Sequence, residues 1–466
     1  MLLQTLREIV GTSHVLTESD DTAPYLTDWR RRFTGRAQAV VRPSSTQQVA
    51  DIVKACAQQR TPVVPQGGNT GLVGGATPSE SGDAIVLSLR RMDRVRAVDA
   101  VNSTMTVEAG CALRQVQQTA HDAGQLFPLS LAAEGSATLG GNLSTNAGGT
   151  QVLRYGTARE LTLGLEVVLA SGDVWNGLRT LRKDNTGYDL RDLFIGAEGT
   201  LGVITAACLK TYPLPRSKVT AIFALDSVSA AIGLLKLAQH SAGAALTAFE
   251  LISDTCMQLV THHFADQRPP FAHRHAQYVL LQLSDHEDEP RAAARLQALA
   301  EDALEKHLII DAAVAQSAAQ STAFWRLREL ISEAQAREGK NIKHDIALPI
   351  SSIERFIAET DALLAARFTG VRMVTFGHLG DGNLHYNVSA SPGATEQRFF
   401  DMQGAIYQCV HDQVIGFRGS ISAEHGIGQL KRDENARYKS AVEMSLMRAI
   451  KQTLDPLNIM NPGKVL

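Results

Sequence analysis

Hydrophobic and polar residues alternate along the first part of the chain in patterns typical of helices followed by a buried strand. Residues 1–10 place leucines among Arg7 and Glu8, which predicts an amphipathic first helix. Residues 46–59 predict a second helix. A short apolar run at residues 61–65 predicts a buried strand, and it leads directly into a glycine-rich stretch. That stretch is the first candidate for function.

A β-hairpin is predicted near residue 380. Residues 371–376 and 384–388 have the apolar and β-branched composition of strands, and residues 380–383 between them are Gly-Asp-Gly-Asn. Glycine and asparagine tolerate positive φ, which a tight hairpin turn requires. The turn would bring His378 and His385 together at the mouth of the hairpin.

These two histidines become candidates for a metal site once a later loop is considered. Residues 422–426 supply a carboxylate, Glu424, beside a third imidazole, His425. Two histidines and one carboxylate leave coordination positions open, as in catalytic sites that bind substrate. Zn²⁺ is the first choice for such ligands and Mn²⁺ the second. Any one of these histidines alone is more typical of an ordinary hydrogen-bonded residue, and only the combination predicts a metal with a neighbouring base. Four other histidines are expected in a solvent-exposed loop: His262, His263, His273 and His275.

Three glycine-rich segments recur in the first half of the chain, at residues 66–75, 133–149 and 196–205. Glycine lets the backbone turn its N–H groups towards a diphosphate with no side chain in the way. Neither the GxGxxG dinucleotide fingerprint nor the GxxxxGK[ST] phosphate loop is present. One such segment would be equally consistent with a flexible loop, but three in one domain predict a long, flat ligand.

Length and composition indicate an ordinary globular protein. At 466 residues the chain exceeds the size of a single core, so two or three domains are expected. A net charge of −3 provides no basic stripe for nucleic acid and no polybasic patch for a membrane surface. The five cysteines have no paired spacing, which predicts reduced, buried thiols. Nucleic acid is therefore not an expected partner.

The chain also lacks the features of a membrane or secreted protein. No apolar run approaches the length that spans a bilayer. The first ten residues have neither a basic cluster nor a small-residue cleavage site, unlike a signal peptide. We therefore expect a cytoplasmic protein without a transmembrane segment.

The glycine-rich segments, together with residues 155–157 and 163–172, resemble the FAD-binding domain of the vanillyl-alcohol-oxidase flavoprotein family. The histidine hairpin, residues 422–426 and residues 455–464 resemble its FAD-dependent D-2-hydroxyacid dehydrogenase branch, so the resemblance covers nearly the whole chain. The loop at 66–75 has neither His nor Cys, so the FAD that the resemblance implies is non-covalent. The FAD-contacting positions that the resemblance implies are Pro65, Gln66, Gly67, Gly68, Asn69, Thr70, Gly71, Glu134, Gly135, Ser136, Thr138, Gly141, Asn142, Asn146, Gly148, Gly156, Glu198, Gly199, Gly202, Ile204 and Asn461.

Three residues narrow the substrate that the resemblance implies. Members of the branch that act on D-2-hydroxyglutarate carry an arginine, a hydroxyl residue four positions later and a lysine eleven positions after that, and Arg328, Ser332 and Lys343 match this spacing. Serine stands here where threonine is usual. On one helix Arg328 and Ser332 would share a face, and guanidinium, hydroxyl and ammonium groups complement carboxylates. Asn387, two residues after His385 in its strand, would face the same side and hold a substrate oxygen. Without the resemblance, such charges are more typical of a solvated surface.

The resemblance implies the oxidation of a small dicarboxylate D-2-hydroxyacid. A metal on His378, His385 and Glu424 would chelate the C2 hydroxyl and C1 carboxylate. His425 would take the hydroxyl proton as the catalytic base, and the C2 hydrogen would leave as hydride to flavin N5. A separate acceptor, such as electron-transfer flavoprotein or a quinone, would receive the electrons.

The expected fold is α+β, with three parts. A two-subdomain FAD-binding domain covers residues 1–215, a cap domain with an antiparallel sheet covers 216–415, and a short helical C-terminal segment covers 416–466. The Pro-Leu-Pro sequence at residues 213–215 marks the first boundary. We allow for a homodimer. Three alternatives stay open: a D-lactate, D-malate or glycolate dehydrogenase on the same scaffold, a non-catalytic flavin-binding electron-transfer subunit, and a metal-dependent hydrolase without flavin.

Overall fold

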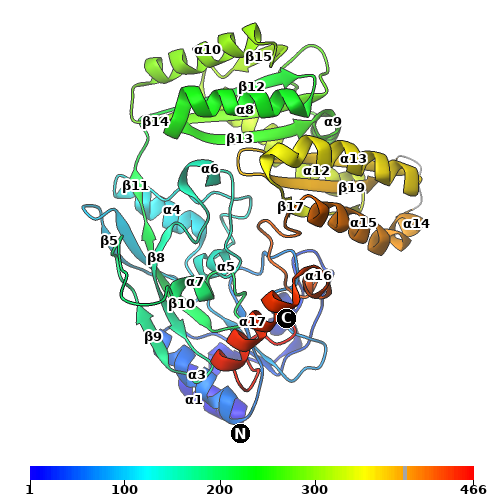
Figure 1. The fold of residues 1–466 in the computed structure, drawn as a ribbon. Coiled ribbons are helices and arrows are strands. Elements are labelled where there is room, and N and C mark those ends of the chain that lie inside the picture. The colour runs from blue at the N-terminus through cyan, green and yellow to red at the C-terminus, as the bar shows by residue number, and fades with distance from the viewer. Residues whose placement is uncertain (392–395) are drawn as a thin grey trace. The chain divides into compact units, whose positions relative to one another are not determined.

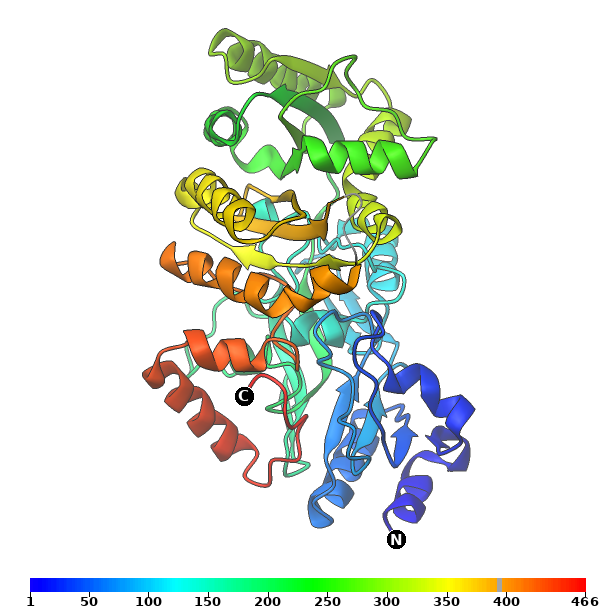
Figure 2. The ribbon, with the colours of Figure 1, turned by 90° about the vertical axis from the view of Figure 1, so that its right-hand side faces the viewer.

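The structure is a computed structural model that describes residues 1–391 and 396–466 (Figure 1). The chain forms two compact units. The first unit contains residues 1–149, 156–214 and 424–466. The second unit contains residues 150–155 and 215–423. Figure 2 shows the same ribbon from a second direction.

The first unit is built around two sheets. The four-stranded sheet has the order β1-β2-β4-β3, with β2, β4 and β3 parallel, and the strand predicted at residues 61–65 is β3, Val63–Gln66. The five-stranded sheet is antiparallel, with the order β5-β6-β10-β8-β9. Strands β7 and β11 form a short separate ladder. The other strands are β1 (Val15–Leu16), β2 (Ala39–Val41), β4 (Ile85–Ser88), β5 (Val95–Asp99), β6 (Thr104–Glu108), β7 (Gln125–Leu126), β8 (Thr162–Val168), β9 (Val174–Gly177), β10 (Val203–Lys210) and β11 (Tyr212–Pro213).

Both predicted N-terminal helices are confirmed. Helix α1, Leu2–Val10, buries the leucine face of its amphipathic pattern. Helix α3, Thr46–Gln58, begins where the Ser45 side chain accepts a hydrogen bond from the Gln48 N–H at 3.2 Å, as a helix N-cap does. The other helices of this unit are η1 (Thr12–His14), α2 (Ser19–Leu26), α4 (Leu113–Asp122), α5 (Leu139–Ser144), α7 (Arg191–Phe194), α16 (Arg432–Tyr438) and α17 (Ala441–Leu454).

The C-terminal residues belong to the first unit and extend its four-stranded sheet. Met460 forms a parallel bridge with Val63, and the Val63 N–H donates to the Ile459 carbonyl at 2.7 Å. Lys451 of α17 donates to the carbonyls of Thr200 and Met460, both at 2.8 Å. The end of the chain therefore lies beside the strand that leads into the first glycine-rich segment.

The second unit contains the predicted antiparallel sheet. Its eight strands have the order β15-β12-β14-β13-β18-β19-β16, with β17 also paired to β19. The predicted hairpin is confirmed as β18, Val371–His378, and β19, Asn383–Ala390. The other strands are β12 (Ser217–Leu225), β13 (Leu246–Ser253), β14 (Gln277–Asp285), β15 (Asp311–Val314), β16 (Asn341–Ile342) and β17 (Asp345–Ala347).

Helices cover this sheet. Helices α8 and α10 pack against each other and against β12 and β14, and Figure 1 shows both beside these strands. The stretch predicted as one helix around Arg328 is divided into α11, Ala318–Glu329, and α12, Ile331–Glu338. His262 and His263 end helix α9, so they do not lie in a loop as expected. The other helices are α6 (Val152–Tyr155), α8 (Val228–Ala242), η2 (Gly243–Ala245), α9 (Asp254–His263), α10 (Glu289–Glu305), η3 (Ile350–Ser352), α13 (Ile353–Arg367), α14 (Glu396–Asp401) and α15 (Gln403–Gly416).

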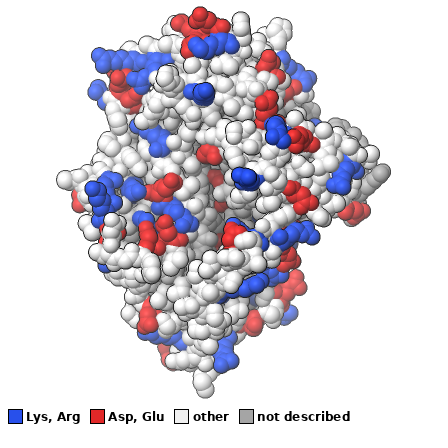
Figure 3. All heavy atoms as spheres, viewed as in Figure 1, with Lys and Arg blue, Asp and Glu red and all other residues white. Residues whose placement is uncertain are grey.

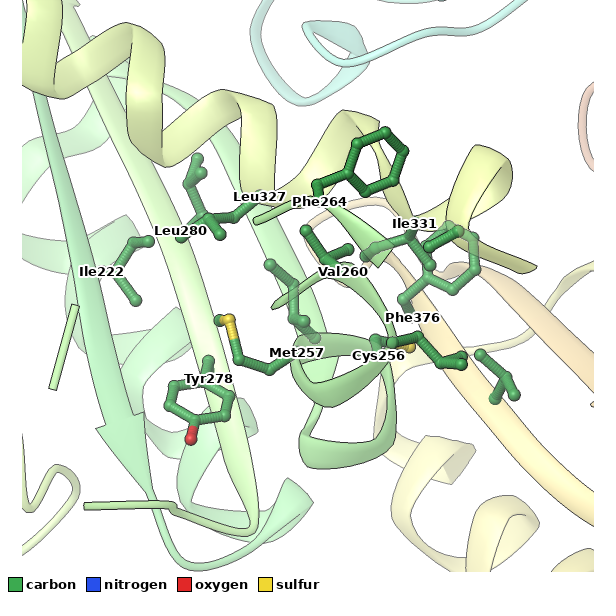
Figure 4. Close-up of a cluster of buried hydrophobic side chains, with 14 of the residues drawn as sticks. Ile222, Cys256, Met257, Val260, Phe264, Tyr278, Leu280, Leu327, Ile331 and Phe376 are labelled. Carbon is green, nitrogen blue, oxygen red and sulfur yellow. The ribbon is translucent and has the colours of Figure 1, made fainter. Parts of the chain in front are cut away.

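A hydrophobic core joins this sheet to helices α9, α11 and α12 (Figure 4). Met257 of α9 and Leu280 of β14 are buried in it together with Phe376 of β18. Leu327 and Ile331, on either side of the break between α11 and α12, are 3% and 0% exposed. Burial of these two side chains fixes the end of α11, where Arg328 lies.

The cysteines and the surface charges match what the composition predicted. All five cysteines are buried and form no disulfide, as predicted. On the face shown in Figure 3, acidic and basic side chains are interspersed. Within the described residues, no helix combines the length and the apolar character needed to cross a bilayer.

Candidate active site

The first two glycine-rich segments lie against each other where β3 ends. A side-chain carbon at Gly67 would come within 2.1 Å of Thr138 Oγ1, and one at Gly68 within 2.0 Å of the Ser136 carbonyl oxygen. Both distances are far below van der Waals contact, so only glycine fits. At Gly71 an added carbon would meet no described atom within 4 Å. The two segments therefore form a cradle of closely approaching backbone.

Side chains of the first segment hold the shape of this cradle. The Gln66 amide donates to the carbonyls of Tyr25 and Ala76, both at 2.9 Å. Asn69 adopts a left-handed conformation with φ of 56°, and its amide donates to the Thr27 carbonyl at 2.9 Å. Both amide nitrogens thus tie the loop to residues 25–27.

Three buried polar atoms near the cradle have no hydrogen-bond partner among the described residues. They are Thr138 Oγ1, Asn142 Nδ2 and Asn461 Oδ1. The Asn461 amide nitrogen donates to the carbonyls of Gly75 and Glu198, at 2.9 and 2.7 Å, which ties the C-terminal segment to two glycine-rich segments. Buried polar atoms are ordinarily satisfied, so these three atoms and the glycine cradle fit a polar cofactor such as FAD.

The third glycine-rich segment holds the loop that carries the candidate base. The buried Glu198 carboxylate accepts hydrogen bonds from the N–H groups of Ile427 and Gly428, at 2.6 and 2.8 Å. Burial raises the pKa of Glu198 to about 7, although these two hydrogen bonds and nearby lysines lower it. The side chain of Glu198, predicted to contact the cofactor, is therefore used to anchor the loop after His425.

Two other predicted cofactor residues also make hydrogen bonds within the protein. Glu134 accepts from the Ser130 hydroxyl at 2.7 Å, and Asn146 accepts from the Arg159 N–H at 2.9 Å. The remaining predicted positions all belong to the first unit: Pro65, Thr70, Gly135, Ser136, Gly141, Gly148, Gly156, Gly199, Gly202 and Ile204.

The loop of Glu424 and His425 is anchored at both ends within the first unit. Glu424 accepts a hydrogen bond from the Gly149 N–H at 2.5 Å, which links the loop to the second glycine-rich segment. Beyond His425, the Glu198 carboxylate holds the next two backbone N–H groups. The half-buried His425 therefore lies between two anchored points of the loop. On one side the Glu424 carboxylate binds a backbone N–H, and on the other the Glu198 carboxylate binds the loop backbone.

In the second unit, His378 and His385 face each other as predicted. Their imidazole centroids lie 5.6 Å apart, and His385 pairs with Phe376 in the ladder of β18 and β19. The turn between the strands requires Gly382, which has φ of 86° and would place a side-chain carbon 2.3 Å from the Leu348 carbonyl oxygen. One hairpin thus presents two imidazoles at the same end.

Glu250 of β13 is a candidate that the sequence analysis missed. It lies opposite His378 in the ladder of β13 and β18, and its carboxylate contacts His378 Nδ1 at 2.5 Å and Arg328 Nε at 2.7 Å. Burial would raise the pKa of Glu250, but the charges and hydrogen bonds of His378 and Arg328 lower it to about 2. The signal in the sequence is a single acidic residue in a strand that has no other charged side chain.

The buried Arg328 guanidinium is held from two directions. Its Cζ atom lies 4.7 Å from the centroid of the Phe376 ring, in a cation–π contact. Glu250 accepts a hydrogen bond from the Nε–H group, whereas Nη1 and Nη2 form no hydrogen bond with a described residue. These terminal nitrogens have the fork geometry that binds a carboxylate.

The other three predicted substrate residues have different surroundings. Ser332 is exposed in α12, whereas Arg328 lies in α11. The expectation that the two residues share one helix is therefore wrong, because the helix is interrupted at Leu330. Lys343 is half-buried between β16 and β17. Asn387 is buried and satisfied at both ends of its amide, donating to Gln335 Oε1 at 2.8 Å and accepting from a backbone N–H at 3.2 Å.

Comparison with protein families defines the class of this protein. Residues 37–177 match the family model "FAD binding domain", and residues 214–465 match "FAD linked oxidases, C-terminal domain". The structure also aligns with that of p-cresol methylhydroxylase with substrate bound, with a TM-score of 0.80 at 17% identity over 100% of this chain and 96% of that chain. The fold is therefore that of a vanillyl-alcohol-oxidase-type flavoprotein, and the chain is an FAD-linked oxidoreductase.

Curated relatives narrow the class. The mitochondrial D-2-hydroxyglutarate dehydrogenase of Arabidopsis thaliana is 38% identical over 99% of this chain and 80% of its own length. The D-2-hydroxyglutarate dehydrogenase of Xanthomonas citri pv. viticola is 39% identical over 99% of this chain and 96% of its own length. This chain therefore belongs to the FAD-dependent D-2-hydroxyacid dehydrogenase family. The name of the plant relative places that protein in mitochondria, whereas the name of the bacterial relative gives no compartment.

Proposed function

We propose that this protein oxidises D-2-hydroxyglutarate to 2-oxoglutarate, with FAD as hydride acceptor and a divalent metal, Zn²⁺ or Mn²⁺, as second cofactor. The names and the high coverage of the relatives support this substrate. The observation that carries the proposal is the arrangement of Arg328, Glu250 and His378. In it, the Arg328 guanidinium and the His378 imidazole contact the two oxygens of the buried Glu250 carboxylate.

In this proposal the substrate is held at both ends. The terminal nitrogens of Arg328 bind the C1 carboxylate, because a planar guanidinium pairs with a carboxylate through two hydrogen bonds. Ser332 and Lys343 bind the distal carboxylate, which D-lactate lacks. Asn387 is proposed to hold a substrate oxygen, although its amide already has two partners within the protein. Binding both carboxylates fixes C2 for reaction.

The metal would be held by His378, His385 and Glu424. Their two nitrogens and one carboxylate oxygen suit a first-row divalent ion with open coordination positions. Since Nδ1 of His378 contacts Glu250, His378 would bind the metal through its other ring nitrogen, Nε2. When bound, such an ion supplies Lewis acidity that lowers the pKa of the substrate's C2 hydroxyl.

His425 is the proposed general base. Its loop is fixed by Gly149 on one side and Glu198 on the other, so the imidazole has a defined position from which to take the hydroxyl proton. Bound FAD supplies the acceptor for the C2 hydride. Loss of one proton and one hydride converts D-2-hydroxyglutarate to 2-oxoglutarate. A separate carrier, electron-transfer flavoprotein or a quinone, then receives the electrons. The proposed compartment of the protein is the cytoplasm.

The visible spectrum of the purified protein tests this proposal. Oxygen-free, metal-replete protein is expected to show oxidised flavin that D-2-hydroxyglutarate bleaches rapidly, with the bleaching lost after chelation. D-lactate and D-malate are the parallel substrates. Bleaching by a monoacid alone would contradict the dicarboxylate substrate, and a colourless protein would contradict FAD-dependent catalysis.

Lys343→Ala tests how the second carboxylate is recognised. The variant is expected to lose at least about 2 kcal/mol of transition-state stabilisation on D-2-hydroxyglutarate, roughly 30-fold in kcat/KM, because a charged hydrogen bond to substrate is removed. Activity on D-lactate should change little. Lys340→Ala, three positions earlier on the exposed surface, is the matched control. Equal losses on both substrates would contradict the assigned role.

A further inference from the structure

Glu250 is a buried carboxylate at the centre of the eight-stranded sheet. Its side chain is 1% exposed, and β13 has neighbours on both sides, β14 and β18. Antiparallel pairing places Glu250 directly opposite His378. The two carboxylate oxygens are divided between two partners: Oε1 contacts His378 Nδ1 at 2.5 Å, and Oε2 contacts Arg328 Nε at 2.7 Å.

Stability alone does not explain a charged residue at this position. A charge in an apolar interior loses its hydration, and replacing a buried ion pair with apolar side chains of similar volume is often neutral or stabilising. The neighbours of Glu250 along β13, Phe249 and Leu251, are themselves buried apolar residues. An acidic residue here therefore indicates a use for its two partners, and those partners are the proposed metal ligand His378 and the proposed carboxylate-binding Arg328.

Each contact leaves the functional end of the partner pointing away from Glu250. A carboxylate on Nδ1 of a metal-binding histidine sets its tautomer, orients the ring and raises the basicity of Nε2. A carboxylate on Nε of an arginine fixes the plane of the guanidinium and leaves both Nη groups for a ligand carboxylate. The same anion also compensates the positive charge of Arg328.

We propose that Glu250 is a positioning residue that orients the metal ligand His378 and the substrate-binding Arg328 at the same time. The inference rests on the proposed function of that site and extends it. Because one carboxylate serves both groups, a change at Glu250 weakens metal binding and substrate binding together. A residue with a purely structural role would change stability without changing either affinity in the folded protein.

The second unit contains a matched control. Glu338 also bridges a histidine and an arginine, contacting His263 Nε2 at 2.6 Å and Arg372 Nη2 at 2.8 Å, but neither partner has a proposed function. Glu250→Gln and Glu338→Gln thus remove the same charge from the same kind of contact. The ligand atoms of His262, His263 and Glu338 also lie within 4.8 Å of one another, so Glu338→Gln removes one of the three possible ligands of this second group.

The experiment measures metal affinity in FAD-loaded, metal-stripped protein, with Zn²⁺ and Mn²⁺ titrated against a chromophoric chelator. Glu250→Gln is expected to bind metal roughly 10 to 100-fold more weakly than wild type, the usual effect of removing such a partner of a metal ligand. Its KM for D-2-hydroxyglutarate in flavin bleaching should also rise, whereas Glu338→Gln should keep the wild-type KM and the wild-type metal affinity at the proposed site of His378. Metal affinity and KM both unchanged in folded Glu250→Gln would overturn the inference.

A second variant keeps the test decisive if Glu250→Gln does not fold. Glu250→Asp keeps the buried charge but is one methylene shorter, so it cannot span both partners at their present distances. We expect roughly a 10-fold loss in metal or substrate affinity, and retention of both would overturn the inference. If D-2-hydroxyglutarate does not bleach the wild-type flavin, the proposed function fails, while the metal titration still judges the role of Glu250 towards His378. If the wild-type protein binds no metal, both the proposed function and the inference about Glu250 are overturned.

Discussion

The second unit contains two groups in which one carboxylate bridges a histidine and an arginine. In the first, Glu250 contacts His378 at 2.5 Å and Arg328 at 2.7 Å. In the second, Glu338 contacts His263 at 2.6 Å and Arg372 at 2.8 Å. The contact distances are nearly the same, but the Glu250 side chain is 1% exposed and the Glu338 side chain 26%.

The difference in burial decides what each group does. Water screens the exposed group, so its ion pairs add little to stability and break without large cost. The buried group is surrounded by protein, where each charge depends on its partners and removing one leaves the others uncompensated. The same three residue types therefore make a replaceable surface contact in one place and a rigid arrangement of the proposed active-site side chains in the other.

The largest expected difference is in stability. Glu250→Ala should lower the free energy of unfolding by about 3–5 kcal/mol, because it leaves the buried charge of Arg328 without its partner. Glu338→Ala should lower it by no more than about 1 kcal/mol. Urea unfolding of the metal-free protein, followed by circular dichroism, measures both. Equal effects of the two substitutions would show that burial does not separate the two groups.

The pH dependence of stability should also be larger for the Glu250 group than for the Glu338 group. The pKa of Glu250 is lowered from 4.5 to about 2, and that of Glu338 is lowered as well. A carboxylate with a lowered pKa in the folded state stabilises the protein above its unfolded pKa, and this stability is lost as the pH falls through the folded value. The stability advantage of wild type over Glu250→Gln, about 3 kcal/mol, should therefore be full at pH 6 and shrink between pH 4.5 and 2.

The control for this measurement is Glu338→Gln in metal-free protein. Its difference from wild type should shrink over the acidic range with the same sign, but from a smaller starting value, because solvent screens the partly exposed pair. Urea midpoints collected across the pH range provide the data. A stability difference for Glu250→Gln that stays constant down to pH 2 would contradict the lowered pKa.

Double-mutant cycles should show a smaller but more specific difference. The coupling free energy between Arg328 and Glu250 is expected to be about 2 kcal/mol, within the range for buried residues in one network. The coupling between Arg372 and Glu338 should be about 0.5 kcal/mol. The four single variants to glutamine and the two double variants supply both cycles. A larger coupling at the exposed pair would reverse the comparison.

The smallest expected effect is that of Glu338→Gln on catalysis. Its kcat/KM for D-2-hydroxyglutarate should stay within about twofold of wild type, because surface substitutions away from the site change free energies by about 0.5 kcal/mol or less. Anaerobic flavin reduction by stopped flow is the measurement. A tenfold loss would indicate that the exposed group also takes part in the reaction.

The amino-acid sequence by itself determined the local elements that carry the candidate site residues. The hairpin was predictable because its alternating strands and glycine turn are encoded within about twenty residues, and the structure confirms that it brings His378 and His385 together. The glycine-rich segments were recognisable in the same way. Close approach of Gly67 and Gly68 to the second segment gives the physical reason for their composition.

Tertiary structure alone decided which distant residues meet these elements. Glu250 is 128 residues from His378 and 78 from Arg328 along the chain, so no local pattern connects them. The break between α11 and α12 places Ser332 on an exposed helix face, although the spacing suggested one helix. Likewise, Asn387 and Glu198 use their side chains within the protein. Local propensity specifies helices, strands and turns, but strand register, burial and the desolvation of charge arise only when the sheet assembles.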